Sequence, residues 1–322
     1  MSSAPTGAAG VIVVAGEALV DMVPGSDGEL QAHPGGGPFN TARTIARLEE
    51  PVAYLGRIST DRHGVALRTQ LAADGVRFDA IVSTDDPTTL AVAELDRDGV
   101  ASYHFETAGT AAPGLTPEQA LAALPSRTGM LHVGTLGLVL EPMASALEAV
   151  VETLPSGALV AVDPNCRPAA TRDAAAYRRR IARVLRRADL VKASDQDLAF
   201  LDPERRPMDA ARRILDKGPS LVLVTRGAFG AVVLTAESEM HVHAPPVKVV
   251  DTVGAGDVFG GAFLAWWHAR SLGPGDLTRL DALAEAARFA CAAAAVTCER
   301  VGAVPPRRAE LAGWLDRSGS PS

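Results

Sequence analysis

The sequence predicts an α/β protein with a doubly wound, mostly parallel central sheet that is flanked by helices on both faces. Short apolar runs rich in Val, Leu and Ile recur along the chain, and segments with helical periodicity lie between them. Hydrophobic residues make up 47% of the 322 residues, which is enough for a large core. Because alternating strands and helices build parallel sheets that are covered on both faces, we expect ligands to bind beyond the carboxyl ends of the strands.

The individual elements follow from this pattern in chain order. The expected strands are Val11–Val14, Val52–Leu55, Met130–Val133, Leu159–Val162, Leu190–Lys192, Leu221–Thr225 and Ala231–Thr235. The expected helices are Asn40–Leu48, Gly64–Asp74, Met143–Leu154, Tyr177–Arg187, Val258–Trp267 and Leu283–Thr297.

A small antiparallel β lid is expected outside the main sheet, built from about residues 21–33 and 88–107. Thr89–Glu94 and Ala101–Glu106 have the pattern of short strands, and the Asp-Gly pair before Ala101 favours a hairpin turn. A lid over a site would exclude water from the reaction. An edge hairpin without a gating role is the alternative.

The sequence predicts a single domain over residues 10–315. No internal repeat and no Pro/Gly/Ser-rich linker divides this part of the chain. Residues 1–9 and 316–322 are mainly small and polar, so we expect both to be disordered tails without a function.

Charge and composition exclude several classes of protein. The net charge is −7, and the densest basic run, Arg178–Arg187, has the spacing of a solvated helix face, so a nucleic-acid partner is not expected. No stretch has the length of a membrane span and no signal peptide is visible, which predicts a cytoplasmic protein. Cys166, Cys291 and Cys298 are too widely spaced for a disulfide framework, and we expect no structural metal.

The strongest motif is DTVGAGD at Asp251–Asp257, which follows a strand-like run and leads into a helical pattern. Gly254, Ala255 and Gly256 would leave backbone N–H groups open at a helix start, where the helix dipole favours an anion. Asp257 would lie beside this anion hole as a base that accepts a proton from an attacking hydroxyl. The alternative is that Asp257 only caps the helix.

The chain has neither a Walker A loop nor a GxGxxG dinucleotide fingerprint, so a nucleotide site must be of another kind. Five segments in order resemble the signatures of the ribokinase-like (PfkB) carbohydrate kinases over roughly residues 11–306. These segments are Gly35–Ala42 (GGGPFNTA), Asp163–Pro168 (DPNCRP), Lys192–Asp197 (KASDQD), Thr225–Gly230 (TRGAFG) and Asp251–Asp257 (DTVGAGD). The resemblance implies a ribokinase-like fold and an ATP-dependent sugar kinase.

Several residues are expected to contact the sugar. Gly36 and Gly37 allow a ligand to lie against bare backbone, and the amide of Asn40 can bind a hydroxyl. Asp21 can accept two hydroxyls or can simply be a turn residue, and the resemblance favours sugar binding. The full substrate set is Asp21, Gly36, Gly37, Asn40, Phe105, Arg167 and Asp257.

The resemblance also implies a nucleotide site and two ions. The nucleotide set is Ser194, Thr225, Gly227, Gly230, Gly254, Gly256 and Cys291, where Cys291 replaces an Asn that relatives often place near the adenine. Asp197 stands for a Glu that organises Mg²⁺ through water. Asp251 and the segment Glu299–Ala303 would hold a monovalent cation such as K⁺.

Fructose is the expected substrate, since GEALVDMVP and GGGPFNTA resemble fructokinases more than ribokinases. The alternatives are a 2-keto-3-deoxygluconate kinase, which the absence of an Arg near Glu106 disfavours, and a ribokinase or nucleoside kinase. A catalytically silent sugar-sensing protein on the same fold is the alternative outside enzymes. Relatives also suggest a homodimer formed through the lid.

Overall fold

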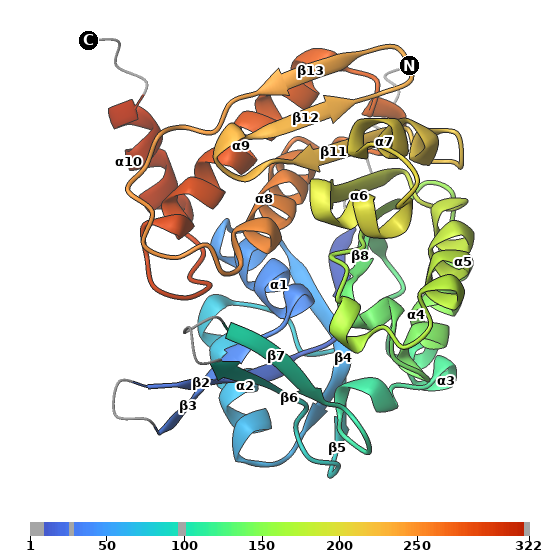
Figure 1. The fold of residues 1–322 in the computed structure, drawn as a ribbon, viewed down its shortest axis with the longest axis vertical. Helices are drawn as coiled ribbons and strands as arrows, with labels where there is room; N and C mark the ends of the chain where they lie inside the picture. Colours follow the sequence, from blue (N-terminus) through green and yellow to red (C-terminus); the bar gives the residue numbers. More distant parts are fainter. Residues whose placement is uncertain (1–9, 26–28, 96–100, 319–322) are drawn as a thin grey trace, which may run out of the picture.

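The computed structural model describes residues 10–25, 29–95 and 101–318, and within them nine strands form the central sheet (Figure 1). In chain order these strands are β1 (Val11–Ala15), β4 (Val52–Ser59), β5 (Ile81–Thr84), β8 (Thr128–Gly134), β9 (Leu159–Asp163), β10 (Leu190–Ser194), β11 (Leu221–Thr225), β12 (Ala231–Leu234) and β13 (Glu239–Val242). Their order across the sheet is β13-β12-β11-β10-β9-β8-β1-β4-β5. β12 and β13 are antiparallel to their neighbours, and the other pairings are parallel. The mostly parallel sheet predicted from the sequence is confirmed.

Two layers of helices cover the sheet. One face carries α1 (Gly37–Arg47), α2 (Arg62–Asp74), α8 (Ala255–Ala269), α9 (Leu280–Cys298) and α10 (Arg308–Ser318). The other face carries α3 (Pro117–Ala123), α4 (Met143–Thr153), α5 (Ala174–Leu185), α6 (Asp195–Leu201) and α7 (Pro207–Leu215). Short 3-10 turns complete the connections: η1 (Ala112–Gly114), η2 (Thr135–Leu138), η3 (Pro168–Ala170), η4 (Gly227–Phe229) and η5 (Pro274–Asp276).

Strand β1 is apolar along its whole length because both of its faces are covered. In β1, Ile12 and Val14 point into the layer under α1 and α8, whereas Val13 and Ala15 point into the opposite layer. All four side chains are fully buried. Since neighbouring residues of a strand face opposite sides, only a sheet with helices on both faces requires such an unbroken apolar run.

The strand order reverses at β1, whose neighbours are β8 and β4. At such a point the connections leave the sheet in opposite directions, and a crevice opens beyond the carboxyl ends of the strands. The N-termini of α1 and α8 both lie at this end of the sheet (Figure 1). The fold therefore places the site between β1 and its neighbours.

The lid is a second sheet of four strands: β2 (Leu19–Pro24), β3 (Leu30–Gly35), β6 (Leu90–Leu95) and β7 (Ala101–Glu106). β2 pairs with β3 and β6 with β7 as antiparallel hairpins, and a parallel pairing of β2 with β6 joins the two hairpins. The predicted Asp-Gly turn at residues 96–100 lies outside the described residues.

The ends of the domain differ slightly from the prediction. Helix α10 continues to Ser318, beyond the predicted limit at residue 315, because Trp314 packs against the core and holds the last turns. The predicted tail at residues 1–9 and the last four residues lie outside the described part of the chain. None of the helices in the described ranges combines the length and the apolar composition that a bilayer crossing requires.

Candidate active site

The start of α8 forms the centre of the site. Its N-cap, Gly254, has a φ of 74°, a left-handed conformation that glycine adopts without steric cost. A Cβ at this position would lie 2.4 Å from the Cβ of Ala303, so the C-terminal loop also leaves no room for a side chain. Within the described chain, the N–H groups of Gly254, Gly256 and Asp257 have no recorded acceptor, which leaves them open to an anion. The N–H of Ala255 donates to the carbonyl oxygen of Thr252 (3.2 Å), so the donor that we assigned to Ala255 is used within the protein.

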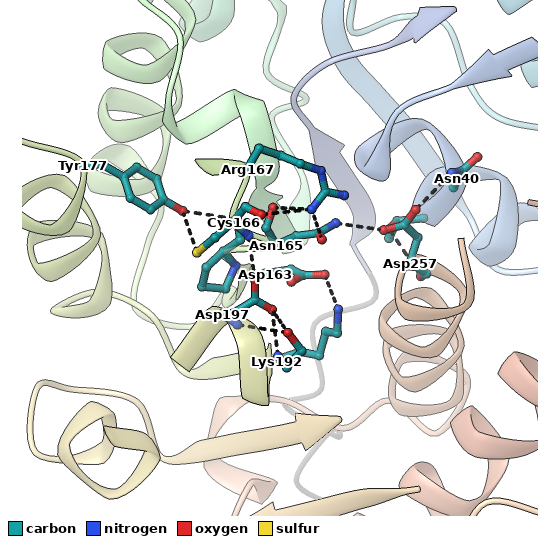
Figure 2. A network of polar contacts seen from close by, with 12 residues as sticks. Asn40, Asp163, Asn165, Cys166, Arg167, Tyr177, Lys192, Asp197 and Asp257 are labelled. Atoms are coloured by element: carbon teal, nitrogen blue, oxygen red, sulfur yellow. Dashed lines mark hydrogen bonds and ion pairs between the residues drawn. The ribbon is translucent and has the colours of Figure 1, made fainter. Parts of the chain in front are cut away.

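Asp257 lies in the first turn of α8 and is buried, with 8% of its surface exposed. Two amides hold its carboxylate: Nδ2 of Asn40 donates to Oδ2 (3.0 Å) and Nδ2 of Asn165 donates to Oδ1 (3.3 Å), as Figure 2 shows. Burial raises the pKa of Asp257 above its usual value, against the lowering effects of the Asn40 hydrogen bond and of the charges on Lys192 and Arg167. Since a cap would aim at its own helix, the contacts with α1 and with the loop after β9 favour the base over the capping alternative.

Asn165 connects Asp257 to Arg167. The guanidinium Nη1 of Arg167 donates to the side-chain oxygen (2.7 Å) and to the backbone carbonyl (2.9 Å) of Asn165. Asn165 has a φ of 36°, a left-handed conformation that is uncommon outside glycine and concentrates at functional sites. The two asparagine amides thus donate to the carboxylate of Asp257, and the guanidinium of Arg167 holds one of them, Asn165, in place (Figure 2).

The glycines at the start of α1 allow this close approach. Gly36 caps α1 with a φ of 109°, and a Cβ there would lie 2.7 Å from the carbonyl oxygen of Glu17. A Cβ on Gly37 would lie 2.6 Å from Cγ2 of Thr135 and 3.3 Å from Oδ1 of Asp257. Gly37 therefore borders the carboxylate of Asp257 directly.

The lid contributes a row of residues that face the body of the protein. Asp21 of β2 is in register with Ala91 of β6, which is in register with Phe105 of β7, so their side chains share one face. Phe105 packs with Ala91 and Leu136, and Leu136 belongs to η2 in the body. Burial raises the pKa of Asp21 to about 6, and the nearby charge of Asp257 adds to the effect while His33 and Arg167 oppose it. The structure thus brings both Asp21 and Phe105 to the side of the lid that covers Asp257.

Four of the predicted nucleotide residues lie at or just beyond the carboxyl ends of β10 and β11. Ser194 and Thr225 are register partners on these strands. Gly227 and Gly230 have φ angles of 53° and 88°, and a Cβ on Gly230 would lie 2.0 Å from the carbonyl oxygen of Val242. The loop after β11 therefore presents backbone beside the hydroxyl groups of Ser194 and Thr225.

Asp197 is the third residue of α6 and forms a capping box with Ser194. Its carboxylate accepts hydrogen bonds from N and Oγ of Ser194 (2.8 and 2.6 Å) and from N of Cys166 (2.6 Å). It is buried, with 6% of its surface exposed. Asp197 therefore ties the loop after β9 to the loop after β10.

Asp251 and Cys291 are two further residues predicted from the sequence. The carboxylate of Asp251 accepts N–H groups from Val253 (3.0 Å) and Gly302 (2.8 Å), which joins the signature loop to the C-terminal segment. Cys291 lies within α9 and packs in the core, where burial raises the pKa of its thiol to about 12. The structure thus places Cys291 among the apolar side chains of the core.

Three contributors were not predicted as site residues. Asn165 donates to the carboxylate of Asp257, and Lys192 and Asp163 form an ion pair beside the start of α8. The signal for the ion pair was present in the sequence, because Asp163 ends the apolar strand β9 and Lys192 interrupts the apolar start of β10.

A buried carboxylate at an open helix N-terminus, beside glycine-lined backbone and under a lid, defines a phosphotransferase that acts on an alcohol. The family model for the pfkB family carbohydrate kinases matches residues 11–309, and the chain belongs to this family.

The similar proteins of known sequence include fructokinases, which are carbohydrate kinases. The chain is 35% identical over 260 residues to a fructokinase of Rhizobium leguminosarum bv. trifolii, which covers 79% of each chain. It is 32% identical to a fructokinase of Salmonella typhimurium, over 92% of this chain and 97% of that protein.

Solved structures give the same result. The fructokinase of Xylella fastidiosa with bound ATP superimposes with a TM-score of 0.89 at 26% identity, over 96% of this chain and 99% of the other. The fructokinase of Vibrio cholerae O395 bound to fructose, ADP and calcium gives a TM-score of 0.84 at 28% identity, covering 95% and 99%. An aminoimidazole riboside kinase of Salmonella enterica gives 0.82 at 28% identity, covering 94% and 99%.

Proposed function

We propose that this protein transfers the γ-phosphoryl group of ATP to a hydroxyl of fructose. The observation that carries the proposal is the carboxylate of Asp257, held by Asn40 and Asn165 at the open N-terminus of α8. The names of the fructokinases that the chain resembles support fructose as the sugar.

The reaction follows from this geometry. The sugar lies between the lid and Gly37, with Asp21 accepting its hydroxyls and Phe105 against its carbon atoms. The carboxylate of Asp257 accepts the proton of the attacking hydroxyl, while a bond forms between that oxygen and the γ-phosphorus and the bond to the bridging oxygen of ADP breaks. The open N–H groups of Gly254 and Gly256 donate to the phosphoryl oxygens as their charge develops.

The residues present fit Mg²⁺ bound through water. A carboxylate has about four acceptor positions, and Asp197 uses three of them within the protein, so one remains for a metal-bound water. When bound, Mg²⁺ would neutralise charge on the ATP phosphates. In the described ranges, no group of three or more His, Cys, Asp or Glu side chains could hold a metal ion directly.

A monovalent cation such as K⁺ is proposed at Asp251. The loops that meet there, through the hydrogen bond from Gly302, are those that flank Gly254. A cation at this place would stabilise the loop that leads into the anion hole. The crystal structure of a double mutant of the Vibrio cholerae fructokinase contains potassium, which supports the choice of ion.

A homodimer through the lid is a separate proposal. β3 is an edge strand of the lid sheet, and its Leu30 is 50% exposed. An exposed edge strand with an apolar side chain favours pairing with a second copy. Sedimentation of the wild type and of Leu30→Lys tests this, and a wild-type monomer at all concentrations would refute it.

The test of the function is ADP release with ATP, Mg²⁺ and a panel of ketoses, aldoses, 2-keto-3-deoxygluconate and nucleosides. We expect the highest kcat/KM for fructose, and a higher value for a riboside would select the nucleoside alternative. Asp257→Asn should bind ATP and fructose normally but lose about 10³-fold or more in kcat, because the base is gone. Wild-type turnover in Asp257→Asn would refute the assignment of the base.

A further inference from the structure

An ion pair lies beneath the first turn of α8 and has no role in the reaction described above. Nζ of Lys192 is 2.8 Å from Oδ2 of Asp163, and the two side chains are 8% and 3% exposed. Lys192 and Asp163 lie on neighbouring strands, β10 and β9, two residues beyond the register partners Leu190 and Ala161. Since Leu190 and Ala161 face α8, Lys192 and Asp163 do so as well.

The stability of the fold does not explain this pair. Removing two charges from water costs more than a single ion pair returns, and an apolar pair of similar volume is often as stable or more so. The preceding side chains on this face, Leu159, Ala161 and Leu190, are apolar. Burial raises the pKa of Asp163, while the carboxylate of Asp163 keeps the pKa of Lys192 above its usual value despite burial. A buried ion pair that the stability of the fold does not explain indicates that Lys192 and Asp163 have a function.

The ammonium of Lys192 lies directly beside the open helix start. A Cβ on Gly256 would be only 3.0 Å from Nζ of Lys192. Figure 2 shows Lys192 and Asp163 on one side and Asp257 with Asn40 on the other, with the space beside the helix start between them. An anion that accepts the N–H of Gly256 therefore comes within reach of the ammonium.

Unused hydrogen-bonding groups remain at this position. In the described part of the chain the ammonium has one hydrogen-bond partner, Asp163, although it carries three donors. Oδ1 of Asp163 is buried and also has no partner there. Nδ1 of the neighbouring His132 is unpaired as well, and burial lowers the pKa of His132 to about 3, so this ring does not compete as a cation. Lys192 thus has free donors next to the anion hole.

The carboxylates near the helix start would repel a phosphate, so a cation is needed there to offset their charge. Asp21, Asp163 and Asp257 are carboxylates, so a phosphate that enters beside Asp257 meets negative charge. Arg167 is a second cation near Asp257, and its Nη1 is held by Asn165 and Cys166. Lys192 is the cation that faces the helix start.

We propose that Lys192 is a catalytic residue whose ammonium donates to the terminal phosphoryl group of ATP in the anion hole, and that Asp163 positions it. This proposal rests on the proposed phosphotransfer. In the reaction the sugar oxygen bonds to the γ-phosphorus, the bond to the bridging oxygen breaks to give ADP, and the hydroxyl proton goes to Asp257. Lys192 keeps its proton throughout and its hydrogen bond strengthens as charge develops on the phosphoryl oxygens.

The test compares Lys192→Met with the double variant Lys192→Met/Asp163→Asn and with Lys217→Met, the same change at an exposed lysine. Calorimetry measures the affinities for ATP and ADP, and the ADP-release assay measures kcat and KM for fructose. We expect Lys192→Met to weaken ATP binding by about ten- to hundredfold, and ADP binding much less, because one charge-assisted hydrogen bond to the terminal phosphate is lost. We expect kcat to fall by about 10²- to 10³-fold with KM for fructose little changed.

The double variant separates catalysis from folding. It leaves no unpaired buried charge, so we expect a melting temperature close to that of the wild type and a kcat as low as in the single variant. Recovery of kcat in the double variant, or equal losses of ATP and ADP affinity, would show a structural role and overturn the proposal. If the wild type binds ATP but phosphorylates no sugar, the proposed function fails, and the difference between ATP and ADP affinities still tests Lys192.

Discussion

Replacement of Asn40 by Ala should move the acid limb of the pH–rate profile to higher pH. The Asn40 amide donates to the buried carboxylate of Asp257 at 3.0 Å, and this hydrogen bond lowers the pKa of the base. Without this donor the carboxylate binds its proton more tightly. A base must be deprotonated to act, so the pH below which activity is lost rises.

The size of the shift follows from the strength of the bond. A hydrogen bond to a charged group contributes about 1.5–3 kcal/mol. Since one pKa unit corresponds to about 1.4 kcal/mol, the acid limb should move by about one to two units. The burial of Asp257 places the effect toward the upper end, because solvent does not replace the lost donor readily.

The assay is kcat/KM for fructose as a function of pH, which reports the ionisation of the free enzyme. Thr41→Val is the matched control, because the Thr41 hydroxyl donates to the backbone oxygen of Asp257 (3.4 Å) and not to its carboxylate. The control should leave the limb in place. An Asn40→Ala enzyme whose acid limb coincides with that of the wild type would refute the assignment of Asp257 as the titrating base.

Two further predictions concern stability. Burial raises the pKa of Glu17 from 4.5 to about 7, so the folded state holds this proton more tightly than the unfolded state does. Relative to Glu17→Gln, the wild type should therefore lose about 3 kcal/mol of its free energy of unfolding between about pH 4 and pH 8. No further loss is expected above that range. Urea unfolding at both pH values measures this, and a constant difference would contradict it. Gly254→Ala should cost at least about 1–2 kcal/mol from its left-handed φ, and more from the contact with Ala303, whereas Gly157→Ala, with no atom within 4 Å, should be near neutral in thermal unfolding.

Much of the fold could be predicted from local patterns. The unbroken apolar run of β1 requires cover on both faces, and this requirement is independent of which helices supply it. The segment DTVGAGD likewise indicated a helix start with open N–H groups, because glycine conformation and helix termini are local properties. The order of the strands in the lid could not be predicted from the sequence. The parallel pairing of β2 with β6 is visible only in the structure.

The contacts that orient the base could not be predicted in this way. Asn40 and Asp257 are separated by 217 positions in the chain, and Asn165 and Asp257 by 92, so their meeting depends on the order of the strands. The pairing of Lys192 with Asp163 depends on the register of β10 against β9. The hydrogen bond that occupies the N–H of Ala255 depends on the turn before α8, which the motif alone does not specify.

By itself, then, the sequence determined the chemistry that is available: a carboxylate, a glycine-lined helix start and a lid of short strands. Only the tertiary structure decided which side chains hold that carboxylate and which cation faces the helix start. The physical reason is that backbone conformation follows from neighbouring residues, whereas hydrogen bonds and ion pairs between distant segments follow from how the layers pack.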